Sequence, residues 1–237
     1  MKTSDSAIQR RLDDAQSGTA RAGVLGISDG LVTNISLILG VAGANADASF
    51  VRLAGLASLV AGAGSMAVGE YISMQAQKEL LERVLSDARA EQRTDPNAMT
   101  ARLAAVFQRA GVHPDDARHA AETVAQHPEQ ALDTYARIGL GFNPKELGAP
   151  VGAAISSLLT FAAGALIPLL PWFFWSGTTA VLISISLSTV AAAAIGGYLG
   201  QQTGKGVVWS AARQVLVVAV AATATYLVGR IFRVRVT

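Results

Sequence analysis

The chain has 237 residues, of which 51% are hydrophobic and 15% are charged, and its mean hydropathy is +0.38. This composition is too apolar for a soluble domain of this length and indicates an integral membrane protein. A formal net charge of +2 is too small to indicate a nucleic-acid partner. The lack of cysteine excludes disulfides, thiolate catalysis, iron–sulfur ligation and cysteine zinc sites.

Residues 1–20 mix Lys2, Arg10 and Arg11 with acids and contain no apolar run, so they predict a cytoplasmic N-terminal segment rather than a cleavable signal peptide. Beyond them, apolar runs are long enough to cross a bilayer, and 58 residues from Leu147 to Gly204 contain no Asp, Glu, Lys or Arg. We predict an all-α integral membrane protein with spanning helices at 21–44, 52–77, 150–170, 177–199 and 213–232.

Residues 78–149 interrupt these spans and divide them into a pair, 21–77, and a group of three, 150–237. The interruption holds 9 basic and 11 acidic residues, which predicts a soluble helical insert. We expect the second spanning helix to continue without a break to Gln92 and to end at Asp95-Pro96. Helices at 100–110 and 114–126 should follow, which with the end of the long helix gives a three-helix insert, and a tail from Pro128 completes it.

Basic residues are more frequent before the first span than after it. By the positive-inside rule, this predicts that the N-terminus and the insert face the cytoplasm, as in a multi-pass protein of a bacterial inner membrane. Five crossings then place Arg230, Arg233 and Arg235 on the opposite side, against the same rule, and we give the first helix more weight.

Asp29 and Glu70 are the acids inside predicted spans, where an ionised carboxylate needs a polar cavity or a partner. Helical spacing places polar residues in a stripe on each of the first two helices. One stripe holds Asp29, Thr33, Ser36 and Gly40, and the other holds Met66, Glu70, Ser73 and Gln77, with Met74 beside it. We expect the two stripes to meet, with Thr33, Ser36, Ser73 and Gln77 lining a polar path.

Carboxylate oxygen together with thioether sulfur suits a first-row divalent cation, and iron(II) and manganese(II) fit best. We therefore predict metal ligands at Asp29, Met66, Glu70 and Met74. A carboxylate that binds metal can also exchange protons, which is the chemistry of an antiporter. In the alternative interpretation the two acids lie hydrated near the membrane interfaces and bind nothing.

Small residues recur at intervals of four, at Gly26 and Gly30 and again at Gly196, Gly200 and Gly204. Such spacing in apolar helices predicts close helix packing. Phosphate-binding and nucleophile motifs are missing from the sequence, so we do not expect an enzyme.

The runs Ser28-Asp29-Gly30-Leu31-Val32-Thr33-Asn34 and Ser65 to Ser73, the latter reading SMAVGEYIS, closely resemble the vacuolar iron transporter family. The five spans, the insert after the second and the run Gly164 to Pro171 are also similar. The resemblance implies a homodimer that moves iron(II), and often manganese(II), out of the cytoplasm in exchange for protons. It also implies that Asp29, Met66 and Glu70 lie on the translocation path at the dimer interface.

The insert departs from that family, whose insert helices carry several glutamates that collect metal. Asn97 to Thr100 and Arg137 to Gly141 stand where the family tends to have acids, so only Glu79, Glu82 and Glu91 remain as candidate collecting residues. We thus expect a bacterial member with a divergent insert. Its partners would be metal ions, protons and the bilayer, with no permanently bound cofactor and no nucleic acid.

Two other functions stay open at this point. One is a membrane-anchored, ferritin-like metal-binding module in which the insert acts, but His119 and Glu122 stand in the reverse of the order that such sites use. The other is a structural membrane protein that transports nothing.

Overall fold

The computed structural model describes residues 18–44 and 46–232, so Lys2, Arg10, Arg11, Arg233 and Arg235 lie outside the described residues. The described part forms two compact units. The membrane unit comprises residues 19–71 and 151–232, and the insert unit comprises residues 18 and 72–150. Helix α3 contributes residues to both units.

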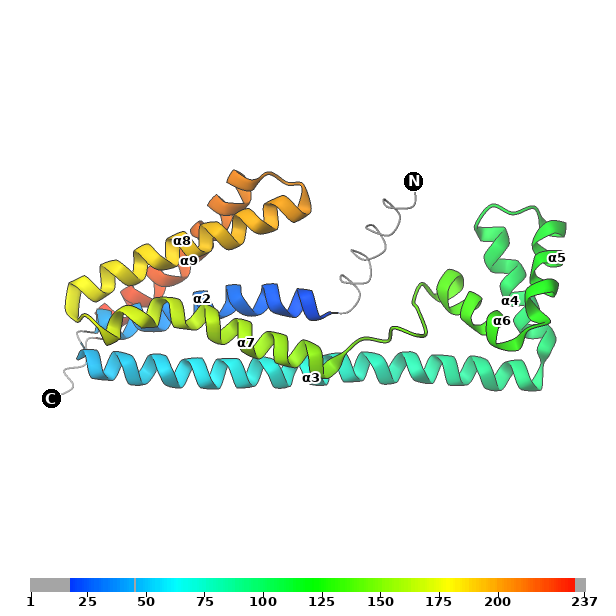
Figure 1. Ribbon diagram of the computed structural model, residues 1–237, viewed down its shortest axis with the longest axis horizontal. Helices are drawn as coiled ribbons and strands as arrows, with labels where there is room; N and C mark the ends of the chain where they lie inside the picture. Colours follow the sequence, from blue (N-terminus) through cyan, green and yellow to red (C-terminus); the bar gives the residue numbers. More distant parts are fainter. Residues whose placement is uncertain (1–17, 45, 233–237) are drawn as a thin grey trace. The chain divides into compact units, whose positions relative to one another are not determined.

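The membrane unit contains the helices that are long and apolar enough to span a bilayer (Figure 1). Five helices in the described residues meet this condition, so the predicted all-α, five-span fold is confirmed. They are α2 (Thr19–Gly43), α3 (Ala48–Thr94), α7 (Pro150–Leu169), which continues into the 3-10 turn η2 (Leu170–Phe173), α8 (Gly177–Thr203) and α9 (Val207–Ile231).

Helix α9 begins at Val207 rather than at Arg213, where the charge led us to place the membrane boundary. Arg213 is instead an exposed residue inside the helix. A long arginine side chain can lay its aliphatic part along apolar surface and carry its charge to the interface, so one arginine does not end a spanning helix.

Helix α2 is the buried centre of the membrane unit. Leu31, Ile35 and Leu39 on α2 pack against Ala192 of α8 and Val218 of α9 in one buried cluster. Close packing of these side chains fixes the side of α2 that faces α8 and α9. The other side of α2 is not covered by these helices, and Asp29 and Thr33 are exposed.

Glycines set the distances between these helices. A Cβ at Gly30 would overlap the backbone of Phe161 on α7, and one at Gly196 would lie 2.5 Å from the carbonyl oxygen of Ser210 on α9. Gly26 and Gly200 make similar close approaches, so the predicted packing role of these four glycines is confirmed. Gly204 was predicted wrongly: it caps the end of α8 with a positive φ of 68°, where nothing lies within 4 Å of its would-be Cβ.

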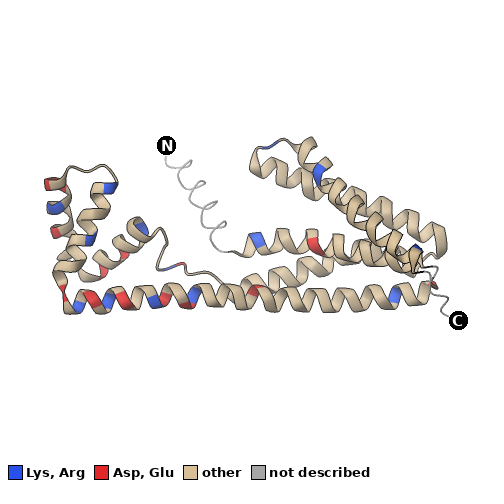
Figure 2. Cartoon of the chain, turned by 180° about the vertical axis from the view of Figure 1, so that it is seen from behind, with Lys and Arg blue, Asp and Glu red and all other residues tan. Residues whose placement is uncertain are grey.

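The insert unit contains the second half of α3 and three short helices, α4 (Pro96–Arg109), α5 (Pro114–Ala125) and α6 (Pro128–Thr134). The charged residues concentrate here and are sparse in the spanning helices (Figure 2). The unit has a core of its own, with Leu103 of α4 fully buried among residues of α3, α5 and α6. The uninterrupted helix predicted from the second span to the Asp95-Pro96 boundary is confirmed.

Two helix boundaries in the insert were predicted wrongly. Helix α4 begins at Pro96, not at residue 100, because the Asp95 carboxylate accepts hydrogen bonds from the amides of Asn97 and Ala98 and so caps the helix. The segment from Pro128 is helical and continues as a π-helix, Tyr135–Leu140. Both prolines occupy the first helical turn, where a missing amide costs nothing.

Candidate functional site

Asp29 and Thr33 lie one turn apart on an exposed side of α2. The Thr33 hydroxyl donates a hydrogen bond of 3.3 Å to Oδ1 of Asp29. Ser36, at the next position of the predicted stripe, is buried instead. The stripe therefore runs from an uncovered carboxylate into the packed part of the membrane unit.

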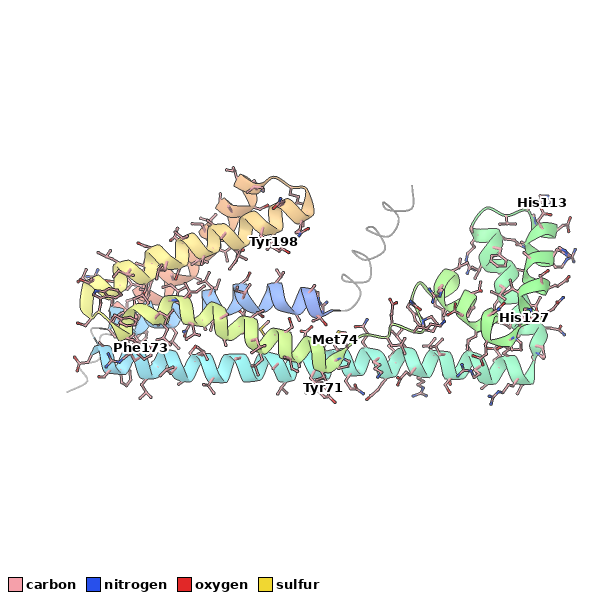
Figure 3. All side chains as sticks on the ribbon, viewed as in Figure 1. Tyr71, Met74, His113, His127, Phe173 and Tyr198 are labelled. Atoms are coloured by element: carbon pink, nitrogen blue, oxygen red, sulfur yellow. The ribbon has the colours of Figure 1, made fainter. Side chains whose placement is uncertain are left out.

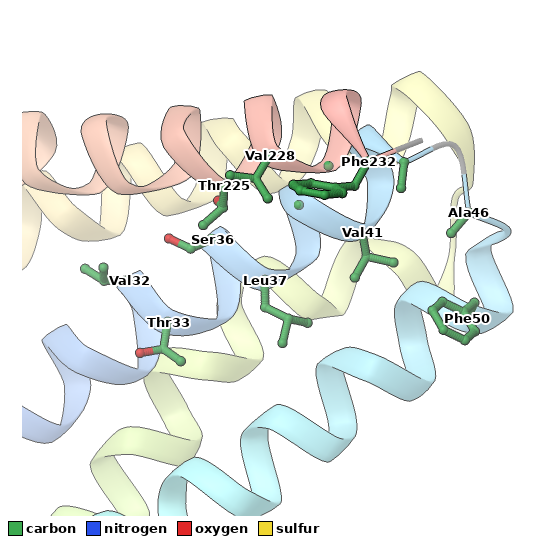
Figure 4. A pocket seen from close by; sticks show the side chains of 13 residues that line it. Val32, Thr33, Ser36, Leu37, Val41, Ala46, Phe50, Thr225, Val228 and Phe232 are labelled. Carbon is green, nitrogen blue, oxygen red and sulfur yellow. The ribbon is translucent and has the colours of Figure 1, made fainter. Parts of the chain in front are cut away.

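A hollow of about 820 Å³ opens beside this stripe, between α2, α9 and the start of α3 (Figure 4). Thr33 and Ser36 line it from α2, and Thr225 lines it from α9. The rest of the lining is apolar, including Val41, Phe50 and Phe232. The Ser36 hydroxyl is buried and has no hydrogen-bond partner among the described residues. The hollow thus offers few polar groups, and Asp29 is not one of its lining residues.

Met66 and Glu70 lie on the side of α3 that faces the rest of the membrane unit. Met66 packs against the buried cluster of Ala63, Phe161 and Ala165. One turn further on, the side chain of Glu70 is only 12% exposed, and its Oε1 accepts a hydrogen bond of 3.3 Å from Nη2 of Arg21 on α2. A thioether and a carboxylate thus share one side of a spanning helix.

Met74, Ser73 and Gln77 belong to the insert unit. Ser73 and Gln77 are exposed, whereas Met74 is 4% exposed. Figure 3 labels Met74 on α3. A Cβ added at Gly148 would lie 2.7 Å from the terminal methyl of Met74, and one at Gly18 would lie 2.9 Å from it. Met74 is therefore closely packed, and its role as a metal ligand stays a prediction.

Each of the candidate collecting glutamates on α3 has a partner from its own chain. Glu79 accepts a hydrogen bond of 2.7 Å from Gln75, and Glu82 lies 3.8 Å from the ammonium of Lys78. Glu91 forms an ion pair of 2.6 Å with Arg102 on α4. In residues 18–44 and 46–232, no group of three or more His, Asp or Glu side chains is arranged to hold a metal ion.

Reasoning from sequence alone missed two residues that the structure brings to this region. Arg21 is the first residue of the first predicted span, and the partner that it contacts lies 49 positions away. Thr225 donates its hydroxyl to carbonyls of its own helix, those of Ala221 and Ala222. A single polar residue in an apolar helix gives no signal that it lines a hollow.

Five apolar helices that carry Asp29 and Glu70 within their spans define a multi-pass membrane protein with ionisable groups in its membrane unit. Such groups are costly in a bilayer and usually mark the path of an ion or substrate. The comparisons with known proteins identify the particular family. A family model described as the VIT family matches residues 20–230, and the chain belongs to that family.

Several named proteins are similar to this chain over most of its length. A vacuolar iron transporter of Centaurea cyanus is 30% identical over 88% of this chain and 85% of its own. Vacuolar iron transporter homolog 1 of Oryza sativa subsp. japonica is 32% identical, over 90% of this chain and 73% of its own. The vacuolar iron transporter of Acanthamoeba castellanii is 34% identical, over 76% of this chain and 68% of its own. The resemblance inferred from the two motifs is confirmed.

Proposed function

We propose that this protein moves divalent iron or manganese across a membrane in exchange for protons. The observation that carries the proposal is Glu70, an acid with a side chain only 12% exposed, inside a helix apolar enough to span a bilayer. Membership of the VIT family and the names of the relatives support metal transport as the activity.

The choice of cation follows from the donor atoms near Glu70. A carboxylate oxygen is a hard ligand, and the thioether of Met66, one turn away on the same helix, is a soft one. Magnesium and calcium prefer oxygen alone, whereas iron(II) and manganese(II) accept mixed ligands. Since a carboxylate that holds a metal ion cannot at the same time hold a proton, successive binding of the two at Asp29 and Glu70 would couple their movements.

We further propose that two copies of the chain act together. Asp29 is exposed on a spanning helix of the single chain, and a carboxylate facing lipid costs several kcal/mol. Helix α3 also exposes a row of small residues spaced by four, Ala57, Ala61, Ser65 and Gly69. Small residues at this spacing allow two spanning helices to approach closely. A second copy on this side would cover the row and bring further polar groups to the site.

The ferritin-like alternative would need acids and histidines gathered in the insert. His113 and His127 instead stand at the N-termini of α5 and α6, at separate places in the unit (Figure 3). The described part of the insert offers no group suited to a metal ion, so this alternative has no supporting observation.

Transport in vesicles tests the proposal. Purified protein in vesicles with an imposed pH gradient should take up Fe²⁺ or Mn²⁺, and the metal flux should drive protons the other way. Asp29→Asn and Glu70→Gln should each reduce the rate at least about tenfold, because the neutral side chains bind cations poorly. Glu129→Gln is the matched control, since it also removes an ion-paired acid, the partner of Arg89 in the insert. Full activity of both single variants would overturn the site, and uptake without proton movement would overturn the coupling.

A further inference from the structure

Arg21 holds a position that the stability of its own helix does not explain. It lies in the first turn of α2, and this first turn contains no acidic residue. The N-terminus of a helix carries the positive end of the helix dipole, so a cation is unfavourable there. Among the residues that the structure describes, Arg21 makes its favourable contact with another helix, because its guanidinium donates to Oε1 of Glu70 on α3.

The two members of this ion pair differ in how firmly they are held. The Glu70 side chain is 12% exposed and is fixed on a helix side that packs against the membrane unit, whereas the Arg21 side chain is 67% exposed. An exposed arginine in an ion pair gives a weak net interaction, since it is also well solvated when it leaves. The Glu70 carboxylate is therefore held in place, whereas the Arg21 guanidinium can dissociate from it at little cost in free energy.

A metal ion and the guanidinium cannot both neutralise Glu70. Bound to the same carboxylate, a divalent ion and a guanidinium would lie a few ångströms apart, where like charges repel strongly in a medium of low polarity. Either cation alone removes the cost of an unpaired, poorly solvated carboxylate.

We infer that Arg21 is a tethered counter-cation, which occupies Glu70 when no metal is bound and is displaced by the transported ion. This inference rests on the proposed role of Glu70 in metal transport. Arg21 then sets the affinity of the site as a competitor built into the chain, and its return to Glu70 opposes rebinding of a released ion. A residue that only supported the site would act with the opposite sign, since its loss would weaken metal binding.

Mn²⁺ binding to the purified full chain distinguishes these signs, with free Mn²⁺ measured by its electron paramagnetic resonance signal. Arg21→Ala and Arg21→Gln should lower the half-saturation concentration roughly threefold to fivefold, because an exposed competing ion pair is lost. Arg21→Lys keeps the charge and should stay within about twofold of the starting protein. Lys205→Ala is the control for general surface charge and should also change little.

Measuring Mn²⁺ binding to the same variants in a Glu70→Gln background completes a double-mutant cycle. Arg21→Ala should there leave Mn²⁺ binding unchanged, since no carboxylate remains for the arginine to occupy. The inference is overturned if Arg21→Ala weakens binding, leaves it unchanged, or acts equally in both backgrounds. Failure of the unmodified protein to bind or transport metal would instead overturn the proposed function. Thermal unfolding of each variant identifies any that is misfolded, and Arg21→Gln and Arg21→Lys then decide the outcome.

Discussion

The side-chain amide of Asn34 on α2 donates a hydrogen bond of 2.6 Å to the main-chain carbonyl oxygen of Ala165 on α7, and this bond is fully buried. It lies near Pro168, which removes one amide from the hydrogen bonds of α7. Nearby, the Ser184 hydroxyl of α8 donates to the carbonyl oxygen of Pro168 at 2.8 Å. Side chains of two neighbouring helices thus donate to main-chain carbonyls in the proline-containing end of α7.

Asn34→Asp should destabilise the membrane unit strongly. The change keeps the side-chain shape but replaces the donor with an acceptor that faces the Ala165 carbonyl, or buries a charge there, at a cost on the order of 3 kcal/mol. Thermal unfolding in detergent should show a midpoint lower by roughly 5 °C or more. Ser186→Ala is the control, because its exposed hydroxyl donates to a carbonyl of its own helix, that of Leu182. Equal midpoints for the two variants would mean that the bond contributes little.

The spans and the long helix α3 were predictable because hydropathy and the positions of glycine and proline act locally along the chain. The tail from Pro128 was mispredicted because a proline that starts a helix and one that ends it look alike in sequence. The pair of Arg21 and Glu70 was not predictable, since its members are 49 residues apart and meet only when α2 and α3 pack. The exposure of Asp29 was not predictable either, because helical spacing shows which residues share one side of a helix but not whether another helix covers that side.

The row of small residues on α3 predicts where a second copy would pack. Replacing Ala61 and Ser65 together with leucine should keep two α3 helices apart and weaken association at least about tenfold. Subunit counting by single-molecule photobleaching in lipid nanodiscs measures the dimer fraction. Val60→Leu, at a neighbouring position that is also exposed, should leave that fraction unchanged. A monomeric starting protein, or a variant that still pairs normally, would contradict a dimer built on α3.

Glu79, Glu82 and Glu91 should prove dispensable for metal uptake. Twelve residues of helix separate the first from the last, which is about 18 Å along the axis, so these two cannot bind one ion together. Their existing partners, Gln75, Lys78 and Arg102, would also have to be displaced. Changing all three to glutamine should therefore leave the half-saturation concentration for transport within about twofold. A rise of tenfold or more would show that the insert does collect metal.

The resemblance to the vacuolar iron transporter family implies export of metal from the cytoplasm, and this direction depends on which side of the membrane each connection occupies. The cysteine-free sequence makes the sidedness measurable with single cysteines. Five crossings and a cytoplasmic N-terminus place Asp47 and Ser176 outside, whereas Gln126 in the insert and Lys205 between α8 and α9 lie inside. A membrane-impermeant maleimide should label Asp47→Cys and Ser176→Cys in intact cells. Gln126→Cys and Lys205→Cys should react only after permeabilisation. A fully reversed pattern would reverse the direction of transport, and different behaviour of Gln126→Cys and Lys205→Cys would contradict five crossings.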